Sequence, residues 1–298
     1  MRRKTTREIE EPFLPGFEPE PENGNGKRAR VESGQGGAEA EVPPELVPEL
    51  ELRKWHPATR YTGPWHNTIH YGNNMDTLRR MPEGTVDLIL TDPPYAINYR
   101  SNRRVKQEKF KHLANDHQGD WIDRFAVEAY RVLKRNRHLY CFCRHDTYPV
   151  FIEAFKRAGF KLKRTLIWVK NNHGSGDLKG DYAPQDEWII YAHKGRRELF
   201  GKRDSNVILG HSRLPSRKLT HSTEKPVSLL KYLIGKSTRP GELVLDPFSG
   251  SGSTMHAAIE MERAYCMIEL SDQYYLTTVK RSSELQQGDM FSEHYRQA

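Results

Sequence analysis

The stretch Val86-Asp87-Leu88-Ile89-Leu90-Thr91-Asp92-Pro93-Pro94-Tyr95 decides the fold that this sequence predicts. Its apolar run, Val86 to Leu90, is typical of a strand buried on both faces, as in parallel sheets. The two prolines end the strand because proline cannot donate to a ladder. The strand therefore delivers a carboxylate, a stiff turn and an aromatic ring to one edge of a sheet.

A second motif, Asp246-Pro247-Phe248-Ser249-Gly250-Ser251-Gly252, follows about 150 residues later, between a short apolar run and a helical pattern. Glycines there let a ligand approach the backbone, and the helix N-terminus offers N–H groups. Glu269 ends the next expected strand, where a carboxylate can accept both hydroxyls of a ribose. A simple tight turn is the structural alternative. The third glycine of a dinucleotide motif and the Gly-Lys-Ser/Thr of a triphosphate site are both absent, which favours S-adenosylmethionine as the cofactor.

The hydrophobic pattern from about residue 65 onward predicts an α/β fold: a doubly wound, mostly parallel sheet covered by helices on both faces. The expected strands are Thr68–Tyr71, Asp87–Thr91, Leu139–Cys143, Leu166–Val169, Trp188–Tyr191, Leu243–Leu245 and Tyr265–Leu270. The expected helices are Met75–Met81, Ile122–Lys134, Tyr148–Ala158, Pro226–Ser237, Thr254–Glu262 and Gln273–Leu285. Thr223 or Ser222 is the expected cap of the helix that begins at Pro226, with Glu224 early in its first turn.

The charge is divided unevenly along the chain. The whole chain carries +8, but residues 1–50 hold seven Lys/Arg and eleven Glu, a net of −4, so the remainder carries +12. A basic domain of this kind suggests a polyanionic partner, although a scattered basic surface is the plainer alternative. Residues 1–55, rich in proline and poor in aliphatic side chains, are predicted to be a disordered tail.

Composition also bears on the compartment. No apolar stretch approaches the roughly 18 residues of a membrane span, and no apolar signal segment begins the chain, so we expect a cytoplasmic protein of a bacterium or its virus. Cys141 and Cys143 alternate within one expected strand and so face the same side. We interpret them, with Cys266, as buried thiols rather than metal ligands, because no second ligand pair lies at suitable spacing. No metal is expected.

Three stretches together resemble the amino-methyltransferases of DNA, in the permuted beta arrangement where Asp-Pro-Pro-Tyr precedes the Phe-x-Gly-x-Gly loop. They are Asp87–Tyr95, His221-Ser222-Thr223-Glu224-Lys225-Pro226 and Leu245–Thr254. The resemblance implies a circularly permuted, Rossmann-like methyltransferase domain over residues 56–285. A basic loop at 97–120, a small target-recognition insertion at about 194–220 and a C-terminal tail at 286–298 complete the expected organisation.

The resemblance also implies residue roles around the cofactor. Asp246, Phe248, Gly250 and Gly252 would surround S-adenosylmethionine, and Glu269 would bind its ribose. Lys225 would lie near the methionine carboxylate, with a plain surface charge as the alternative. Asn73 stands where the family usually has an acid facing the cofactor adenine, and its amide oxygen can still accept from the adenine amino group.

The tetrapeptide itself indicates methyl transfer to an amino group of a flipped base. Asp92 and the Pro93 carbonyl can accept from the NH2, Pro94 stiffens the turn, and Tyr95 offers a ring for stacking. By the resemblance, a leading aspartate favours adenine N6 in DNA. Cytosine N4 is the enzymatic alternative, and a non-catalytic DNA-binding accessory subunit is the alternative of another class.

The expected partner is double-stranded DNA, and the expected contacts come from two basic segments. The residues expected to bind DNA are Arg100, Arg103, Arg104, Lys106, Arg196, Arg197 and Arg217. Gln287-Gly288-Asp289-Met290-Phe291 resembles the peptide by which bacterial proteins bind the sliding clamp, although Gly288 replaces its leucine. Self-association as a homodimer is a further expectation. The recognition sequence and a restriction partner stay open.

Overall fold

The computed structural model describes residues 63–94, 120–173, 179–180, 182–212 and 224–296. The expected N-terminal tail, Tyr95 and most of the expected basic loop therefore lie outside the described residues. In chain order the elements are β1 (Thr68–Tyr71), α1 (Asn74–Arg80), β2 (Val86–Thr91), α2 (Asp120–Val132), β3 (Leu133–Cys143), α3 (Tyr148–Arg157), β4 (Lys161–Leu162), β5 (Leu166–Val169), β6 (Asp186–Lys194), β7 (Val207–Ile208), α4 (Val227–Ser237), β8 (Leu243–Asp246), α5 (Ser253–Glu260), β9 (Ala264–Glu269) and α6 (Asp272–Arg296).

The strands of the described residues form one nine-stranded sheet in the order β1-β9-β8-β2-β3-β6-β5-β7, with β4 paired to β6. The pairs from β1 through β3 are parallel, whereas β6 runs antiparallel to both β3 and β5. The α/β prediction with a mostly parallel sheet is confirmed. β2 lies directly beside β8, although about 150 residues separate them in the chain.

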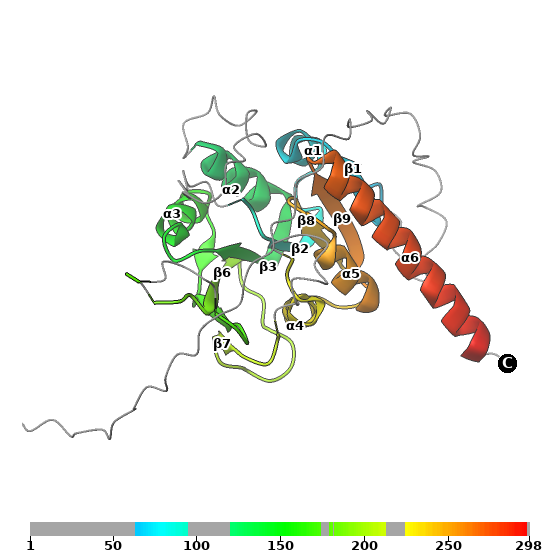
Figure 1. Cartoon of the computed structure of the whole chain (residues 1–298). Helices are drawn as coiled ribbons and strands as arrows, with labels where there is room; N and C mark the ends of the chain where they lie inside the picture. The colour runs from blue at the N-terminus through cyan, green and yellow to red at the C-terminus, as the bar shows by residue number, and fades with distance from the viewer. Residues whose placement is uncertain (1–62, 95–119, 174–178, 181, 213–223, 297–298) are drawn as a thin grey trace, which may run out of the picture. The chain divides into compact units, whose positions relative to one another are not determined.

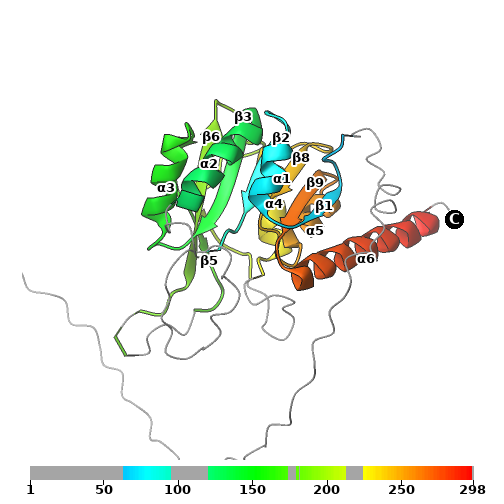
Figure 2. The ribbon, with the colours of Figure 1, turned by 90° about the horizontal axis from the view of Figure 1, so that it is seen from above.

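Side chains alternate between the two faces of the sheet, as strand geometry requires. In β2, Ile89 packs in one core with α1, α2 and α3, while Leu88 and Leu90 pack in the other with α4 and α5. Figure 1 shows these two helical layers on opposite sides of the sheet, and Figure 2 shows the arrangement from above. Double coverage explains why β2 is buried along its whole length.

Asp87 is a charged residue inside the buried run of β2, and its environment explains why it is tolerated. Its carboxylate accepts hydrogen bonds from Lys134 Nζ at 2.7 Å, Arg137 Nε at 2.9 Å and the backbone N of Leu243 at 3.1 Å. A buried carboxylate needs such partners because desolvation alone would be very costly. Asp87 thus ties β2 to β3 and β8 at the amino end of the parallel strands.

The structure corrects several predicted boundaries. α6 continues to Arg296, so residues 286–296 are helical rather than a tail, and Gln287–Phe291 lies within a helix instead of after it. β3 begins six residues earlier than expected, because its polar first half pairs with the amino side of β2 and with β6. The short strands β4 and β7 were missed, since two residues carry no periodic pattern.

The expected cap of α4 is also wrong. Pro226 is the N-cap and provides no side-chain cap bond, so Glu224 precedes the helix rather than joining its first turn. Thr223 and Ser222 lie outside the described residues. Among the residues that the structure describes, no helix is long and apolar enough to cross a membrane.

All three thiols are buried, and Cys141 and Cys143 belong to the same core, as predicted. Burial raises the pKa of Cys143 and of Cys266 to about 12 and raises that of Cys141 as well.

We therefore predict that a thiol reagent such as 5,5′-dithiobis(2-nitrobenzoate) at pH 8 labels no cysteine of the native protein, because the thiolate is the reactive form. Denaturation in guanidinium should release three thiols. A Val127→Cys variant, at a position that is 54% exposed on α2, provides the control that should label at once. Rapid labelling of the unmodified native protein would contradict the buried assignment.

Candidate active site

Three neighbouring parallel strands end at one edge of the sheet and bring the two sequence motifs together. Asp92 follows the last residue of β2, Asp246 ends β8, and Glu269 ends β9. In open α/β sheets, ligands bind outside the carboxyl ends of the strands. The tetrapeptide and the glycine loop therefore share the edge where a ligand site is expected.

Asp246 joins these strand ends through hydrogen bonds. Its Oδ1 accepts from the Thr91 hydroxyl at 2.8 Å and from the backbone N of Phe248 at 3.1 Å. Its Oδ2 accepts from the Thr254 hydroxyl at 2.7 Å, in the first turn of α5. Burial raises the pKa of Asp246 to about 6, although these three donors oppose the rise. Asp246 thus ties the strand of the tetrapeptide to the cofactor loop and the helix behind it.

The two glycines of the loop differ in what surrounds them. Gly252 has φ +80° and is the N-cap of α5, and a Cβ there would lie 2.8 Å from Cγ2 of Thr278 in α6. Gly250 has φ +54°, but a Cβ there would meet no atom within 4 Å. Gly252 is therefore needed for close packing of α6, whereas Gly250 borders open space.

Glu269 lies against the same loop and is half-buried. Its Oε2 accepts from the backbone N of Gly250 at 2.8 Å, and its Oε1 accepts from the backbone N of Ser271 at 2.8 Å. Burial raises the pKa of Glu269 against the effect of these donors. A carboxylate has about four acceptor positions, so each oxygen keeps capacity for a ligand hydroxyl.

Phe248 and Ser249 of the glycine loop differ in their contacts. The Phe248 ring packs edge-on against Trp121 and Phe125 of α2, with centroid separations of 6.0 and 5.4 Å. Within the described residues, the buried Ser249 hydroxyl has no hydrogen-bond partner. Such an orphaned donor is unusual in a protein interior and is consistent with a ligand that completes its bonding.

Asn73 closely follows the end of β1, which lies beside the end of β9. Tyr71 is in register with Glu269, and the backbone N of Gly72 donates to the Glu269 carbonyl at 2.9 Å. The Asn73 side chain caps α1 by accepting from the backbone N of Met75 at 2.8 Å. The amide oxygen of Asn73 therefore already accepts one hydrogen bond within the protein, and a cofactor would share this oxygen with the helix cap.

Lys225 contacts the tetrapeptide directly. Its ammonium forms an ion pair with Asp92 Oδ2 and lies 3.3 Å from Glu187 Oε2. Burial lowers the pKa of Lys225, but the charges of Asp92 and Glu187 outweigh that effect and raise it above its ordinary value. The structure thus gives Lys225 two carboxylate neighbours within the protein.

Glu224, the residue before Lys225, contacts the helices that flank the glycine loop, α5 and α6. Its buried carboxylate accepts from the Ser253 hydroxyl at 3.0 Å and from Arg281 Nη2 at 2.6 Å. Arg281 in α6 also donates to the Ser251 carbonyl at 2.9 Å. The Glu224-Lys225 pair therefore links the glycine loop on one side to the tetrapeptide on the other.

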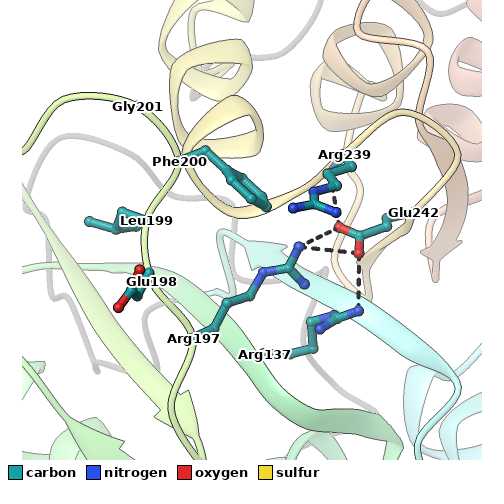
Figure 3. A pocket seen from close by; sticks show the side chains of 8 residues that line it. All are labelled: Arg137, Arg197, Glu198, Leu199, Phe200, Gly201, Arg239 and Glu242. Atoms are coloured by element: carbon teal, nitrogen blue, oxygen red, sulfur yellow. Dashed lines mark hydrogen bonds and ion pairs between the residues drawn. The ribbon is translucent and has the colours of Figure 1, made fainter.

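The expected DNA-binding residues that the structure describes, Arg196 and Arg197, lie near the amino ends of the parallel strands, on the side opposite to Asp92. Arg197 donates to Glu242 at 2.9 Å, and Glu242 also accepts from Arg137 Nη2 at 3.0 Å. This group lines a hollow of about 600 Å³ next to Phe200, shown in Figure 3. Arg196 follows β6 at the same edge and is exposed. The structure does not bring either arginine together with Asp92, and Arg100, Arg103, Arg104, Lys106 and Arg217 lie outside the described residues.

Sequence reasoning missed two charged residues of this edge, Glu187 and Lys170. Glu187 is the second residue of β6, and Lys170 directly follows β5, with 3.5 Å between Lys170 Nζ and Glu187 Oε1. A charged residue at the boundary of an apolar strand was the available signal. Only the antiparallel pairing of β6 with both β3 and β5 shows that the two residues lie on the same side of the sheet as Asp92.

We predict that Gly252→Ala lowers the free energy of unfolding more than Gly250→Ala does. Gly250→Ala should cost only the ~1–2 kcal/mol of a left-handed residue with a Cβ, whereas Gly252→Ala adds the contact with Thr278. Urea unfolding measures both. Thr278→Ser removes Cγ2, so adding it to Gly252→Ala should restore part of the loss. Equal losses in the two glycine variants would contradict this packing.

We also predict that Thr91→Val, an isosteric change, lowers the free energy of unfolding by about 1.5–3 kcal/mol, because it removes a hydrogen bond to a buried carboxylate. Thr85→Val is the matched control, since the Thr85 hydroxyl donates to the Pro82 carbonyl at an exposed turn rather than to a buried carboxylate. Thermal or urea unfolding compares them. An equally small loss of unfolding free energy in both variants would show that the Thr91–Asp246 hydrogen bond does not stabilise the protein as predicted.

Comparison with known proteins agrees with this arrangement. The family model for DNA methylases matches residues 86–280. YubD of Escherichia coli (strain K12), which is named as a methylase, is 34% identical over 217 residues, covering 73% of this chain and 90% of YubD. The DNA adenine methyltransferase YhdJ of the same strain is 29% identical over 246 residues, covering 72% of this chain and 82% of YhdJ.

Among solved structures, the complex of M1.HpyAVI with S-adenosylmethionine has a TM-score of 0.54 and 26% identity, covering 72% of this chain and 98% of that one. The order of the motifs, with the strand of the tetrapeptide ahead of the glycine loop, is the permuted one expected from the sequence. The chain therefore belongs to the DNA methylase family, in its beta arrangement.

Proposed function

We propose that this protein transfers a methyl group from S-adenosylmethionine to the N6 amino group of adenine in DNA. The observation that carries the proposal is the Thr91–Asp246 hydrogen bond, which holds Asp92 beside the strand end where the glycine loop begins. The name of YhdJ as a DNA adenine methyltransferase supports adenine as the target. The leading aspartate of the tetrapeptide supports the same choice.

The residues around the glycine loop fit the proposed cofactor. Glu269 keeps acceptor capacity for ribose hydroxyls, Gly250 borders open space, and the Ser249 hydroxyl is buried without a partner among the described residues. When bound, S-adenosylmethionine supplies a methyl group on a positively charged sulfur. Phe248 and Gly252 would shape the loop around it, and Asn73 would face its adenine with weaker bonding than an acid provides.

The tetrapeptide supplies the groups that an exocyclic amine needs. The nitrogen lone pair of adenine N6 is delocalised into the ring, so the amine is a poor nucleophile in its planar form. If Asp92 and the Pro93 carbonyl both accept from the NH2, they favour a tetrahedral nitrogen whose lone pair is exposed. Pro94 stiffens the turn, and Tyr95, as the sequence predicts, would stack on the base. The adenine must leave the duplex to reach this site.

DNA as the substrate follows from the family, while the residues that read it are proposed from the sequence. The basic residues of 97–120 and Arg217 would contact phosphates near the flipped nucleotide. Part of the expected recognition segment, at 194–212, is bound to the sheet: β7 pairs with β5, and Trp168 Nε1 donates to the His211 carbonyl at 2.8 Å. Clamp binding through Gln287–Phe291, self-association and a cytoplasmic location stay predictions.

Methylation of unmodified DNA by the purified full-length protein tests the function, with mass spectrometry of the nucleosides as readout. We expect N6-methyladenine from the native protein. Asp92→Asn should lower transfer by about 100-fold or more, the scale of a lost proton acceptor, without weakening cofactor binding. Asp123→Asn is the matched control, because Asp123 pairs with Arg157 on an exposed helix surface.

The alternatives give different products. N4-methylcytosine without N6-methyladenine would show that the target is cytosine. Binding of DNA with no methyl transfer to any sequence would favour the accessory subunit. Full activity of Asp92→Asn would remove Asp92 from the chemistry.

A further inference from the structure

Four charged side chains alternate in sign along the carboxyl edge of the sheet. Asp92 pairs with Lys225, Lys225 lies 3.3 Å from Glu187, and Glu187 lies 3.5 Å from Lys170. They come from four places in the chain: the end of β2, the turn before α4, the start of β6 and the end of β5. This charge chain, Asp92–Lys225–Glu187–Lys170, connects the tetrapeptide to the β5–β6 hairpin.

The charge chain is shielded from solvent, so its pairs matter more than surface ion pairs. The Lys225 side chain is 8% exposed and the Lys170 side chain 11%, while Asp92 and Glu187 are 23% and 24% exposed. The Lys225 ammonium also lies 5.0 Å from the centre of the Phe142 ring. An ammonium in such a place requires its carboxylate partners, because a buried charge without them is strongly unfavourable.

The contacts of Asp92 within the charge chain affect the orientation of its carboxylate, and therefore its chemistry. Rotation of a carboxyl group about its terminal torsion is only weakly restricted by the side chain itself. The bond from Lys225 to Oδ2 selects one orientation of this carboxylate. Misplacement of a reacting group by about 1 Å can cost about 100-fold in rate.

We propose that Lys225 is a positioning residue that holds the Asp92 carboxylate in the orientation needed to accept from the adenine amine, and that Glu187, backed by Lys170, holds Lys225. The proposal rests on the function proposed above and assigns Lys225 to the amine side of the site. It differs from the expectation drawn from the family resemblance, in which Lys225 binds the cofactor carboxylate. The Lys225 ammonium is hydrogen-bonded to Asp92 and lies within ion-pair distance of Glu187.

Two measurements separate these roles: the single-turnover rate of methyl transfer at saturating cofactor, and the dissociation constant for S-adenosylmethionine by calorimetry. The variants are Lys225→Gln, Lys225→Arg, Glu187→Gln and the double variant Lys225→Gln/Glu187→Gln. Lys231→Gln is the matched control, because Lys231 lies on α4 and pairs with Glu260 on the surface. Thermal unfolding of each variant checks its folding, and the isosteric Glu187→Gln tests the charge chain even where Lys225→Gln fails to fold.

We expect Lys225→Gln and Glu187→Gln to lower the single-turnover rate by about 10- to 100-fold while the cofactor dissociation constant stays within about twofold. Lys225→Arg should recover part of the rate, because it keeps the charge. The double variant should lose little more than Lys225→Gln alone, since Glu187 acts through Lys225. Lys231→Gln should match the native protein in both measurements.

Other results overturn the proposal. A weaker cofactor affinity with an unchanged rate at saturation would make Lys225 a cofactor ligand. An unchanged rate in Glu187→Gln would remove Glu187 from the role, and additive losses in the double variant would show that the two residues act independently. Failure of the proposed function is separate, because it would appear as absent adenine methylation by the native protein.

Discussion

The buried carboxylate of Asp246 is the interaction on which the arrangement of this protein depends. It is 3% exposed and would be costly to bury alone, but donors from β2, from the glycine loop and from α5 converge on it. Removing it would leave hydroxyls and a backbone N–H without their acceptor. Because Thr91 immediately precedes Asp92, the same bonds that satisfy Asp246 also set the distance between the tetrapeptide and the cofactor loop.

Similar ion pairs occur at the amino ends and at the carboxyl ends of the parallel strands, but they have different roles. At the amino edge, Asp87 and Glu242 are surrounded by Lys134, Arg137 and Arg197, which staple β2, β3 and β8 together. At the carboxyl edge, Asp92 is paired with Lys225 but is 23% exposed, against 4% for Asp87. A paired carboxylate that stays accessible can still accept from a ligand, whereas a fully enclosed one serves stability.

Much of the fold could be predicted from the sequence because its elements have strong local patterns. The continuous apolar run of β2 and the helical spacing in α2 and α4 identified these elements to within a few residues. Errors arose where a partner decided the outcome: the polar half of β3 is a strand because β6 pairs with it, and α4 is capped by Pro226 rather than by a side chain. For the site, Asp92, Asp246 and Glu269 were identified by their positions at strand ends, but Glu187 and Lys170 were not.

The sequence by itself determined the class of this protein, because the order of the tetrapeptide and the glycine loop and the residues within them are local features of the chain. It also determined which carboxylates end the strands. Tertiary structure alone decided the partners of those carboxylates: Thr91 and Thr254 for Asp246, Gly250 for Glu269, and Lys225 for Asp92. These contacts join residues as many as 155 positions apart. No local pattern encodes them, since they exist only once the sheet has placed its strand ends side by side.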